Sequence, residues 1–296
     1  MGERPLPTGG ALDGQVAVIT GAGRGLGRAY ALAYARAGAR VVVNDLDADS
    51  AASVVDEIGA LGGAAVANHD TVAEPSGAGR IVAAGVDRFG RIDVMITNAG
   101  ADRRGPALDL APDDWELTLR THLFGSIHCS AEAGRAMRSQ GGGVIVNVCS
   151  AAFYVGTPTL APYGVAKGGI YGLMRALAGE LAPFGISVNA VAPPLTATAP
   201  ALAFVDSLAD MGLTAEQVEA MRSSMPQPED VALITVFLAT PEGRRLSGRL
   251  LTMTKDELSV IGPPDGGLPV RAAGERWSLE ELGAAIGSLR AGPTTA

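Results

Sequence analysis

Short runs of apolar, often β-branched residues alternate with longer Ala-rich stretches along most of the chain. The apolar runs lie at 16–20, 41–44, 64–67, 94–97, 144–148, 186–191 and 249–253. The stretches with helical periodicity lie at 25–37, 48–61, 76–89, 113–139, 161–182 and 229–240. Strands that are apolar throughout, rather than alternating, are typical of a parallel sheet covered by helices on both faces. The pattern therefore predicts one α/β, doubly wound domain over residues 12–254.

Three segments fall outside this pattern. Residues 1–11 contain Pro and Gly but no apolar core, which predicts a short flexible leader rather than a secretory signal. Residues 193–228 are irregular and rich in Pro, and we expect 195–226 to close over a substrate as a lid. Residues 255–296 are expected to form a C-terminal extension, in which 278–281 has the spacing of a capping box before a short helix.

Composition excludes several classes of partner. The chain has 296 residues, 47% of them hydrophobic, and a net charge of −8 without a long basic run, which argues against nucleic acid. No apolar stretch approaches the roughly 20 residues that span a bilayer, so no membrane partner is expected. The two cysteines, Cys129 and Cys149, are too few for a disulfide framework and fit a reducing cytoplasm. No metal site is expected.

A glycine-rich stretch follows the first apolar run. Gly21, Gly25 and Gly27 allow a tight turn between a strand and a helix, where backbone N–H groups and the helix N-terminus can hold a pyrophosphate. Arg24 and Leu26 lie in the same stretch and are expected to contribute to this cofactor site, Arg24 by pairing with a phosphate. A lone glycine turn is weak evidence, but its place in the first βαβ unit favours dinucleotide binding.

The second apolar run ends at Asp45. A carboxylate at this place can accept hydrogen bonds from the adenosine ribose hydroxyls and would repel a 2′-phosphate. Asp45 could instead be an ordinary turn residue at the end of a strand, yet the glycine loop upstream favours ribose binding. The sequence therefore predicts NAD as cofactor in preference to NADP.

Two further strand ends are expected at the same edge of the sheet. Asp70 and Thr71 follow the third run, where a carboxylate can accept from the adenine amino group. Asn98, Ala99 and Gly100 follow the fourth run and provide a floor of small residues beneath the cofactor. Because cofactors bind at the carboxyl ends of parallel strands, both places are suitable. Either could also be a turn signal alone.

Ser150, Tyr163 and Lys167 form the candidate proton-transfer set. Ser150 follows the fifth run, while Tyr163 and Lys167 lie one turn apart on the same face of a predicted helix. A free tyrosine titrates near pH 10, and a neighbouring ammonium can lower its pKa by roughly 1–3 units. Ser150 would then orient the substrate oxygen. Taken alone, Tyr163 and Lys167 could be a surface pair and Ser150 could be a strand cap. The place of all three beside a nucleotide loop favours catalysis.

These motifs together resemble the short-chain dehydrogenase/reductase family. The family's TGxxxGxG motif matches residues 20–27, its NAG motif matches 98–100, and its Ser and YxxxK residues match Ser150, Tyr163 and Lys167. The resemblance covers about residues 12–253. It implies a Rossmann-like fold with a seven-stranded parallel sheet, NAD(P)-linked oxidation or reduction of a small molecule, and a homo-oligomer, tetramer or dimer. It also implies that Tyr163 and Lys167 contact the cofactor, Lys167 through the nicotinamide ribose.

Some positions depart from the family pattern. His122 stands where the family commonly has an Asn that holds a water in a proton relay, and it could serve the relay or be a neutral structural residue. The PGxxxT motif is altered, because Pro194 replaces Gly and removes a backbone donor next to Pro193. Thr196 and Thr198 remain as contacts for the nicotinamide amide.

Residues 41–47, 121–126 and 277–281 resemble the branch that contains the 3-hydroxyacyl-CoA dehydrogenase domain of peroxisomal multifunctional enzymes. The expected function is hydride transfer between NAD(H) and a secondary alcohol or ketone on a fairly apolar substrate, such as a steroid, terpenoid, polyketide or 3-hydroxyacyl thioester. Arg103 and Arg104 could bind a CoA thioester or could lie in a solvated loop. The alternative is a catalytically inactive dinucleotide-binding sensor or structural subunit, suggested by His122 and Pro194.

Overall fold

The structure is a computed structural model that describes residues 10–210, 212–254 and 257–261. Three predicted features lie outside the described residues. They are residues 1–9 of the leader, most of the C-terminal extension, and within it the capping box at 278–281 with the short helix after it.

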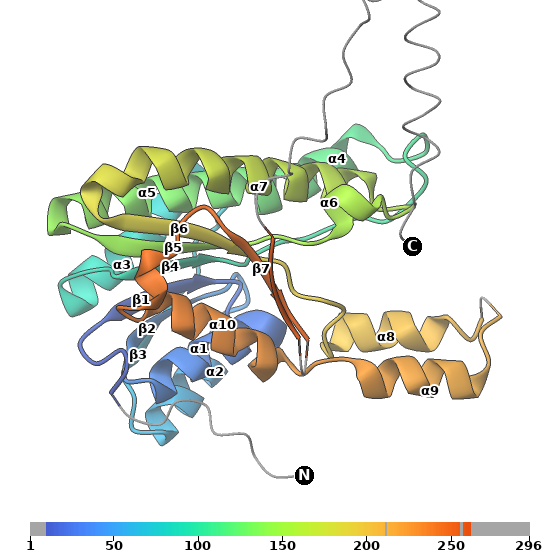
Figure 1. The fold of residues 1–296 in the computed structure, drawn as a ribbon, viewed down its shortest axis with the longest axis horizontal. Helices are drawn as coiled ribbons and strands as arrows, with labels where there is room; N and C mark the ends of the chain where they lie inside the picture. Colours follow the sequence, from blue (N-terminus) through green and yellow to red (C-terminus); the bar gives the residue numbers. More distant parts are fainter. Residues whose placement is uncertain (1–9, 211, 255–256, 262–296) are drawn as a thin grey trace, which may run out of the picture. The chain divides into compact units, whose positions relative to one another are not determined.

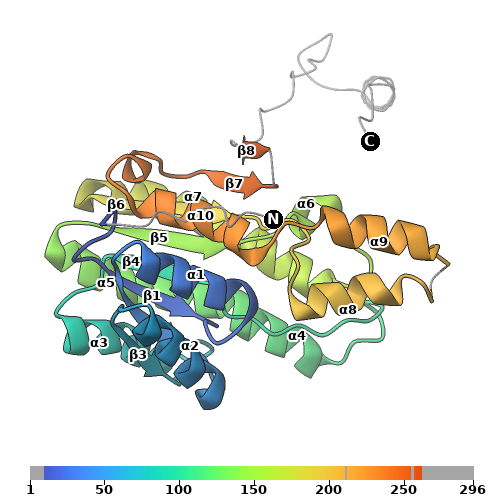
Figure 2. The same cartoon turned by 90° about the horizontal axis from the view of Figure 1, so that it is seen from below.

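A single sheet of eight strands, ordered β3-β2-β1-β4-β5-β6-β7-β8, forms the centre of the described structure (Figures 1 and 2). The first seven strands are parallel, which confirms the predicted parallel sheet. Their bounds are β1 (Val16–Thr20), β2 (Arg40–Asn44), β3 (Ala65–Asn68), β4 (Val94–Thr97), β5 (Gly143–Val148), β6 (Ile186–Val191), β7 (Leu250–Met253) and β8 (Leu258–Ile261).

The eighth strand is an addition to the predicted seven. β8 pairs antiparallel with β7, in the register that places Val260 opposite Leu251. The connection is short, and the N–H of Thr254 donates to the carbonyl of Glu257 over 2.9 Å. The chain therefore turns back as a hairpin directly after β7, so the sheet extends past the last strand that the sequence predicts.

Helices cover both faces of the sheet, as predicted. The helices α1, α2 and α10 lie on one face, and α3, α5 and α7 on the other (Figure 1). Their bounds are α1 (Gly25–Arg36), α2 (Ala48–Ala60), α3 (Pro75–Phe89), α4 (Pro112–Thr118), α5 (Gly125–Gln140), α6 (Ala152–Val155), α7 (Ala161–Leu181), α8 (Ala199–Ser207), α9 (Ala215–Ser224) and α10 (Pro228–Ala239), with short 3₁₀ turns η2 (Ala182–Phe184) and η3 (Gly243–Arg245). Over the described residues, no helix combines the length and the apolar character needed to cross a membrane.

The strands are apolar throughout because each contributes to two cores. Along β1, Ala17 and Ile19 join the cluster on the α1 side, while Val18 joins the cluster on the α3 side. All three side chains are buried. A strand with helices on both faces has no position that faces water, which is the physical reason for the continuous pattern.

The helix predicted over 113–139 consists of three parts. Between α4 and α5 lies a π-helical segment, η1 (Leu119–Phe124). A π segment accommodates extra residues in a turn, so it changes which side chains face inward, and such segments are frequent at functional sites. In this chain η1 contains His122, whose side chain is buried.

The segment predicted to be irregular contains two helices. α8 and α9 pack against each other in a hairpin that follows the carboxyl end of β6 and extends away from the sheet (Figures 1 and 2). An ion pair joins Asp206 of α8 to Arg222 of α9. At the base of the hairpin, the N–H of Ala197 donates to the carbonyl of Pro226 over 2.9 Å. Pro200 lies in the first turn of α8, where proline is compatible with a helix.

Candidate active site

The glycine loop lies between β1 and the N-terminus of α1, as predicted. A Cβ atom at Gly27 would lie 2.0 Å from the carbonyl oxygen of Gly21, so only glycine allows this close approach. The side chain of Asn98 donates to the carbonyls of Thr20 and Gly21 over 3.0 and 3.1 Å. Asn98 therefore holds the loop in place, which is a structural role beyond the predicted floor of the site. Leu26 packs against the core on the α1 side.

Asp45 fixes the same loop from the second strand. One carboxylate oxygen accepts from the N–H of Gly23 over 2.9 Å, and the other accepts from the N–H of Asp47 over 3.1 Å. These bonds leave further lone pairs on the carboxylate for a ligand, since each oxygen has two. Asp45 therefore combines a structural role in the loop with an acidic group at the predicted ribose position.

A pocket of about 300 Å³ lies along the carboxyl ends of these strands. It is lined by Gly21, Arg24, Asn44, Asp45, Leu46, Asp47, Asp70, Thr71, Val72, Asn98, Ala99, Gly100, Ala101 and Thr121. The structure thus brings together eight residues from the predicted cofactor set. The other lining residues are chain neighbours of that set, except Thr121, which reaches the pocket from η1.

Asp70 is charged and already has protein partners. Its carboxylate accepts from Arg80 Nε over 2.6 Å and from the Asn68 amide over 2.9 Å. The hydrogen bond from Arg80 is the main reason that the pKa of Asp70 is lowered. Sequence reasoning missed this partner because Arg80 lies on α3, one helix further along the chain.

Ser150, Tyr163 and Lys167 converge at the end of β5 and the start of α7. Burial raises the pKa of Tyr163, and a side-chain hydrogen bond with Ser150 opposes this shift. The ammonium of Lys167 lies 5.2 Å from the centre of the Tyr163 ring and donates to the carbonyl of Val148 over 2.7 Å. Lys167 is 3% exposed, and burial lowers its pKa to about 8. The predicted proton-transfer set is therefore assembled in one place.

His122 joins this set to the pocket. Its ring lies edge-on to the Tyr163 ring, with the centres 5.1 Å apart. On its other side it lies against Gly100, where a Cβ atom would be 1.9 Å from Cε1 of His122. Among the described residues, neither ring nitrogen has a hydrogen-bond partner. Burial, and then the charge of Lys167, lower the pKa of His122 well below its ordinary value, so the imidazole is neutral.

The segment after β6 approaches the glycine loop through Thr198. The methyl group of Thr198 is 3.5 Å from the position of a Cβ atom on Gly25. The hydroxyl of Thr196 donates to the carbonyl of Pro194 over 2.7 Å, and Thr196 is buried. Pro194 therefore supplies an acceptor to the turn although it has no N–H. Pro193 and Thr196 do not line the pocket described above.

Comparison with known proteins gives three informative similarities. A short-chain reductase, NovJ of Streptomyces niveus, is 39% identical over 240 residues, which cover 79% of this chain and 90% of NovJ. The hydroxyacyl-CoA dehydrogenase ChsB1 of Mycobacterium tuberculosis is 33% identical over 294 residues, covering 95% and 90% of the two chains. A solved structure of 7α-hydroxysteroid dehydrogenase, complexed with NADH and 7-oxo glycochenodeoxycholic acid, is 31% identical with a TM-score of 0.74, covering 83% and 94%.

The family profile of the short chain dehydrogenases matches residues 15–206, which is more than half of the chain. The match begins just before β1 and includes the glycine loop, Asp45, Ser150, Tyr163 and Lys167. It therefore confirms the resemblance that the sequence motifs indicate. The chain belongs to the short-chain dehydrogenase family of oxidoreductases.

Proposed function

We propose that the protein interconverts a secondary alcohol and a ketone on a fairly apolar small molecule, with NAD(H) as cofactor. The observation that carries this proposal is the convergence of Ser150, Tyr163 and Lys167 next to the pocket that contains Asp45. His122 links the two places, because it contacts both Tyr163 and Gly100.

The residues of the pocket fit a dinucleotide. Because Gly27 has no side chain, the backbone of the glycine loop is open toward a pyrophosphate. The helix α1 begins in this loop at Gly25, and its N-terminus carries a partial positive charge. A nicotinamide cofactor, when bound, supplies or accepts the hydride. The pyrophosphate would be held by Gly21, Arg24, Gly25, Leu26 and Gly27, the adenosine by Asp45, Asp70 and Thr71, and the nicotinamide end by Asn98, Ala99, Gly100, Tyr163, Lys167, Pro193, Thr196 and Thr198.

The three polar side chains have separate roles in the proposed reaction. In reduction, the Tyr163 hydroxyl donates a proton to the substrate oxygen, and Ser150 holds that oxygen by a hydrogen bond. In oxidation, Tyr163 must accept the proton, and the ammonium of Lys167 favours the phenolate by its charge. Burial is the main reason that the pKa of Tyr163 is raised, so this charge is needed for the oxidative direction.

His122 is proposed to serve a proton relay as a neutral group, with its two ring nitrogens, which have no partner among the described residues, as donor and acceptor. His122→Phe keeps the contact with the Tyr163 ring but removes both ring nitrogens, and we expect kcat to fall by roughly 10-fold or more. His122→Asn restores a donor and an acceptor and should recover most of the activity. Because the pKa of His122 is held well below 6.5, the wild-type profile of kcat against pH should show no step at that value. Full activity of the Phe variant would leave His122 with a packing role only.

Asp45 is proposed to select NAD. Asp45→Asn keeps an oxygen acceptor for the N–H of Gly23 but removes the charge that repels a 2′-phosphate. We expect the ratio of kcat/KM for NADP to that for NAD to rise by roughly 10- to 100-fold. Asp49→Asn is the matched control, because Asp49 lies in the first turn of α2 and does not line the pocket. An unchanged ratio in the Asp45 variant would contradict the assignment.

Exposed apolar side chains near the carboxyl edge of the sheet support an apolar substrate. Tyr154 and Val155 belong to α6, just before α7, while Leu195 and Phe204 belong to the segment after β6.

The experiment that tests the function is a turnover screen with NAD and NADP over simple secondary alcohols, steroids and 3-hydroxyacyl-CoA thioesters. Cofactor binding without turnover of any class would favour a dinucleotide-binding subunit instead.

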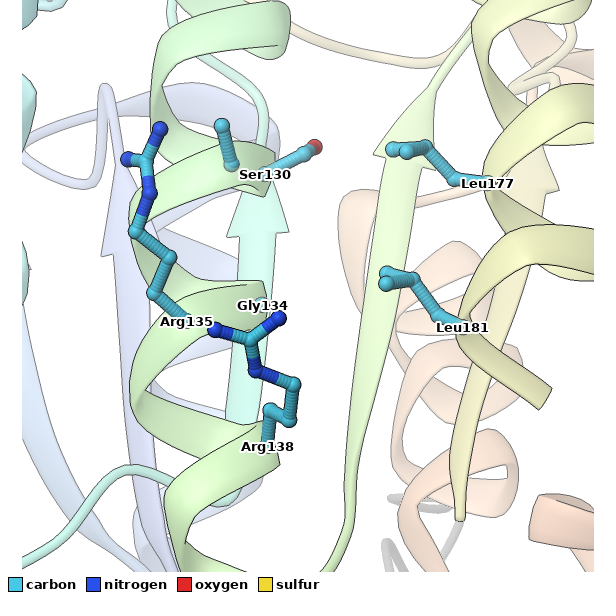
Figure 3. Close-up of a pocket in the computed structure, with 7 residues that line it drawn as sticks. Ser130, Gly134, Arg135, Arg138, Leu177 and Leu181 are labelled. Carbon is cyan, nitrogen blue, oxygen red and sulfur yellow. The ribbon is translucent and has the colours of Figure 1, made fainter. Parts of the chain in front are cut away.

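We also propose that a second copy of the chain packs on the outer face of α5 and α7. Figure 3 shows the groove between these helices, with Leu177 and Leu181 projecting from α7 and Arg135 and Arg138 from α5. The exposed positions of α7 include small residues, which allow a second helix to approach closely. They are Gly172, Ala176 and Gly179. Light scattering should therefore give the mass of a dimer or tetramer, whereas a monomeric mass would overturn this proposal.

A cytoplasmic location is proposed from the state of the thiols. Cys129 and Cys149 are both free and buried, and burial raises the pKa of each. Such thiols are compatible with a reducing compartment. Fractionation of expressing cells tests this proposal, and recovery from an oxidising compartment would contradict it.

A further inference from the structure

The loop after β4, residues 101–111 (the β4 loop), is anchored next to the proposed active site at two points. The hydroxyl of Thr121 on η1 accepts from the N–H of Ala101 over 3.0 Å. The N–H of Gly105 donates to the carbonyl of Thr159 over 3.1 Å. Thr159 lies two residues before the start of α7 and is the one non-glycine residue in the described chain with a positive φ, +64°. The β4 loop is therefore tied to the elements that carry His122 and Tyr163.

Arg104 lies in the loop between the anchored residues Ala101 and Gly105, and its side chain reaches α8 of the α8–α9 hairpin. Its guanidinium carbon is 5.4 Å from the centre of the Phe204 ring on α8. Its ionic partner, Asp102, is loosely paired, with 3.5 Å between Nε and the carboxylate oxygen. Among the described residues, Arg104 donates no side-chain hydrogen bond. A contact with a phenyl ring does not consume N–H donors, so the guanidinium retains its capacity to bind an anion.

The charges of this loop act on Tyr163. Burial is the main cause of the raised pKa of Tyr163; beyond burial, the charge of Asp102 raises it and that of Arg104 lowers it. Both side chains are therefore near enough to influence a substrate that is bound at Tyr163. Coulombic effects of this kind decline with distance and with exposure to solvent.

Arg103 is placed differently although it is the neighbouring residue. Its guanidinium donates to the carbonyl of Asp102 over 3.4 Å, and it lies 3.9 Å from the carboxylate of Asp114 on α4. Arg103 is thus directed to its own loop and to α4, whereas Arg104 is directed to α8. The two arginines have similar exposure, 58% and 54% of the side chain, so they form a matched pair for comparison.

We propose that Arg104 binds an anionic group of the substrate, a carboxylate or a phosphate remote from the reacting carbon, while Phe204 contacts the apolar body of the same molecule. Asp102 is the internal counter-ion that this group displaces. The planar guanidinium fork suits both carboxylate and phosphate oxygens. The inference rests on the proposed function and names a substrate class for it: amphipathic alcohols or ketones that carry a negative charge.

The test uses pairs of substrates with the same reacting group, in which one member carries the anionic group and the other lacks it. One pair is a hydroxysteroid carboxylic acid and its methyl ester, and the other is a 3-hydroxyacyl-CoA and the corresponding N-acetylcysteamine thioester. For Arg104→Met we expect kcat/KM of the charged member to fall by roughly 10- to 100-fold and that of the neutral member by less than about 3-fold. A carboxylate subsite predicts this loss in the first pair, and a phosphate subsite predicts it in the second.

Two further variants sharpen the result. Arg103→Met should change neither member of either pair, because Arg103 is directed to α4. Asp102→Asn removes the competing carboxylate and should raise the preference for the charged member severalfold, the opposite sign to Arg104→Met. An equal loss for the charged and neutral members in Arg104→Met would overturn the proposal and leave Arg104 as a residue that only holds α8.

Binding gives a second measurement that does not depend on turnover. The charged steroid acid should raise the melting temperature of the wild-type NADH complex and have a smaller effect on the Arg104→Met complex. Turnover of the neutral members by the wild type establishes the proposed function separately. The absence of a charge preference in an active wild-type enzyme would refute the Arg104 inference alone.

Discussion

Replacing Tyr163 with Phe will lower kcat by roughly 10²- to 10⁴-fold, the range that general acid–base groups contribute, while NADH binding changes little. The variant loses the hydroxyl that pairs with Ser150, and with it the proton that reduction requires. The ring remains, so the contacts with His122 and with the Lys167 ammonium, both near 5 Å, are kept. Steady-state rates and titration of NADH fluorescence measure the two effects separately.

Tyr171→Phe is the matched control for this experiment. Tyr171 lies two turns further along α7, where its ring stacks on Phe153 with the centres 5.1 Å apart. Removing its hydroxyl should leave kcat at the wild-type value. Substantial turnover in Tyr163→Phe would show that another group transfers the proton and would refute the proposed mechanism.

The parallel sheet and the glycine loop could be predicted because each depends on local sequence. Strands such as β1 and β5 are buried on both faces, so their composition alone identifies them. The convergence of Tyr163 and Lys167 was predictable for the same reason, since residues four apart on one helix share a face. Ser150 follows the end of β5, so it was also predictable that Ser150 lies at the carboxyl edge of the sheet, next to these two residues.

Other parts of the structure depend on contacts that the sequence pattern does not contain. The residues of the π segment η1 do not distinguish it from a regular α-helix. The inward position of His122 follows from its packing against Gly100. β8 forms by pairing with the free edge of β7. This pairing between strands is not visible in the local sequence pattern. α8 was missed because its proline suggested an irregular segment, although Pro200 lies in the first turn.

Lys167 is expected to cost the protein stability as well as to support catalysis. The fold buries an ammonium whose pKa falls from 10.5 to about 8, because burial disfavours the charged form. Between these values the unfolded chain binds more protons than the folded chain, so stability rises with pH. Below about pH 8 the penalty is complete, and above pH 10.5 it disappears.

Lys167→Met should therefore be inactive and yet more stable than the wild type at pH 7 in the absence of cofactor. The difference in pKa corresponds to roughly 1–3 kcal/mol once the lost hydrogen bond to Val148 is set against it. Urea unfolding at pH 7 and at pH 10.5 measures this gain, which should shrink at the higher pH. Lys167→Arg keeps the charge and should therefore gain no stability. It should also lose most activity, because the planar guanidinium is broader than an ammonium and distributes its charge. A Met variant less stable than the wild type at pH 7 would mean that the ammonium is well accommodated, and the conflict between stability and catalysis at this position would not exist.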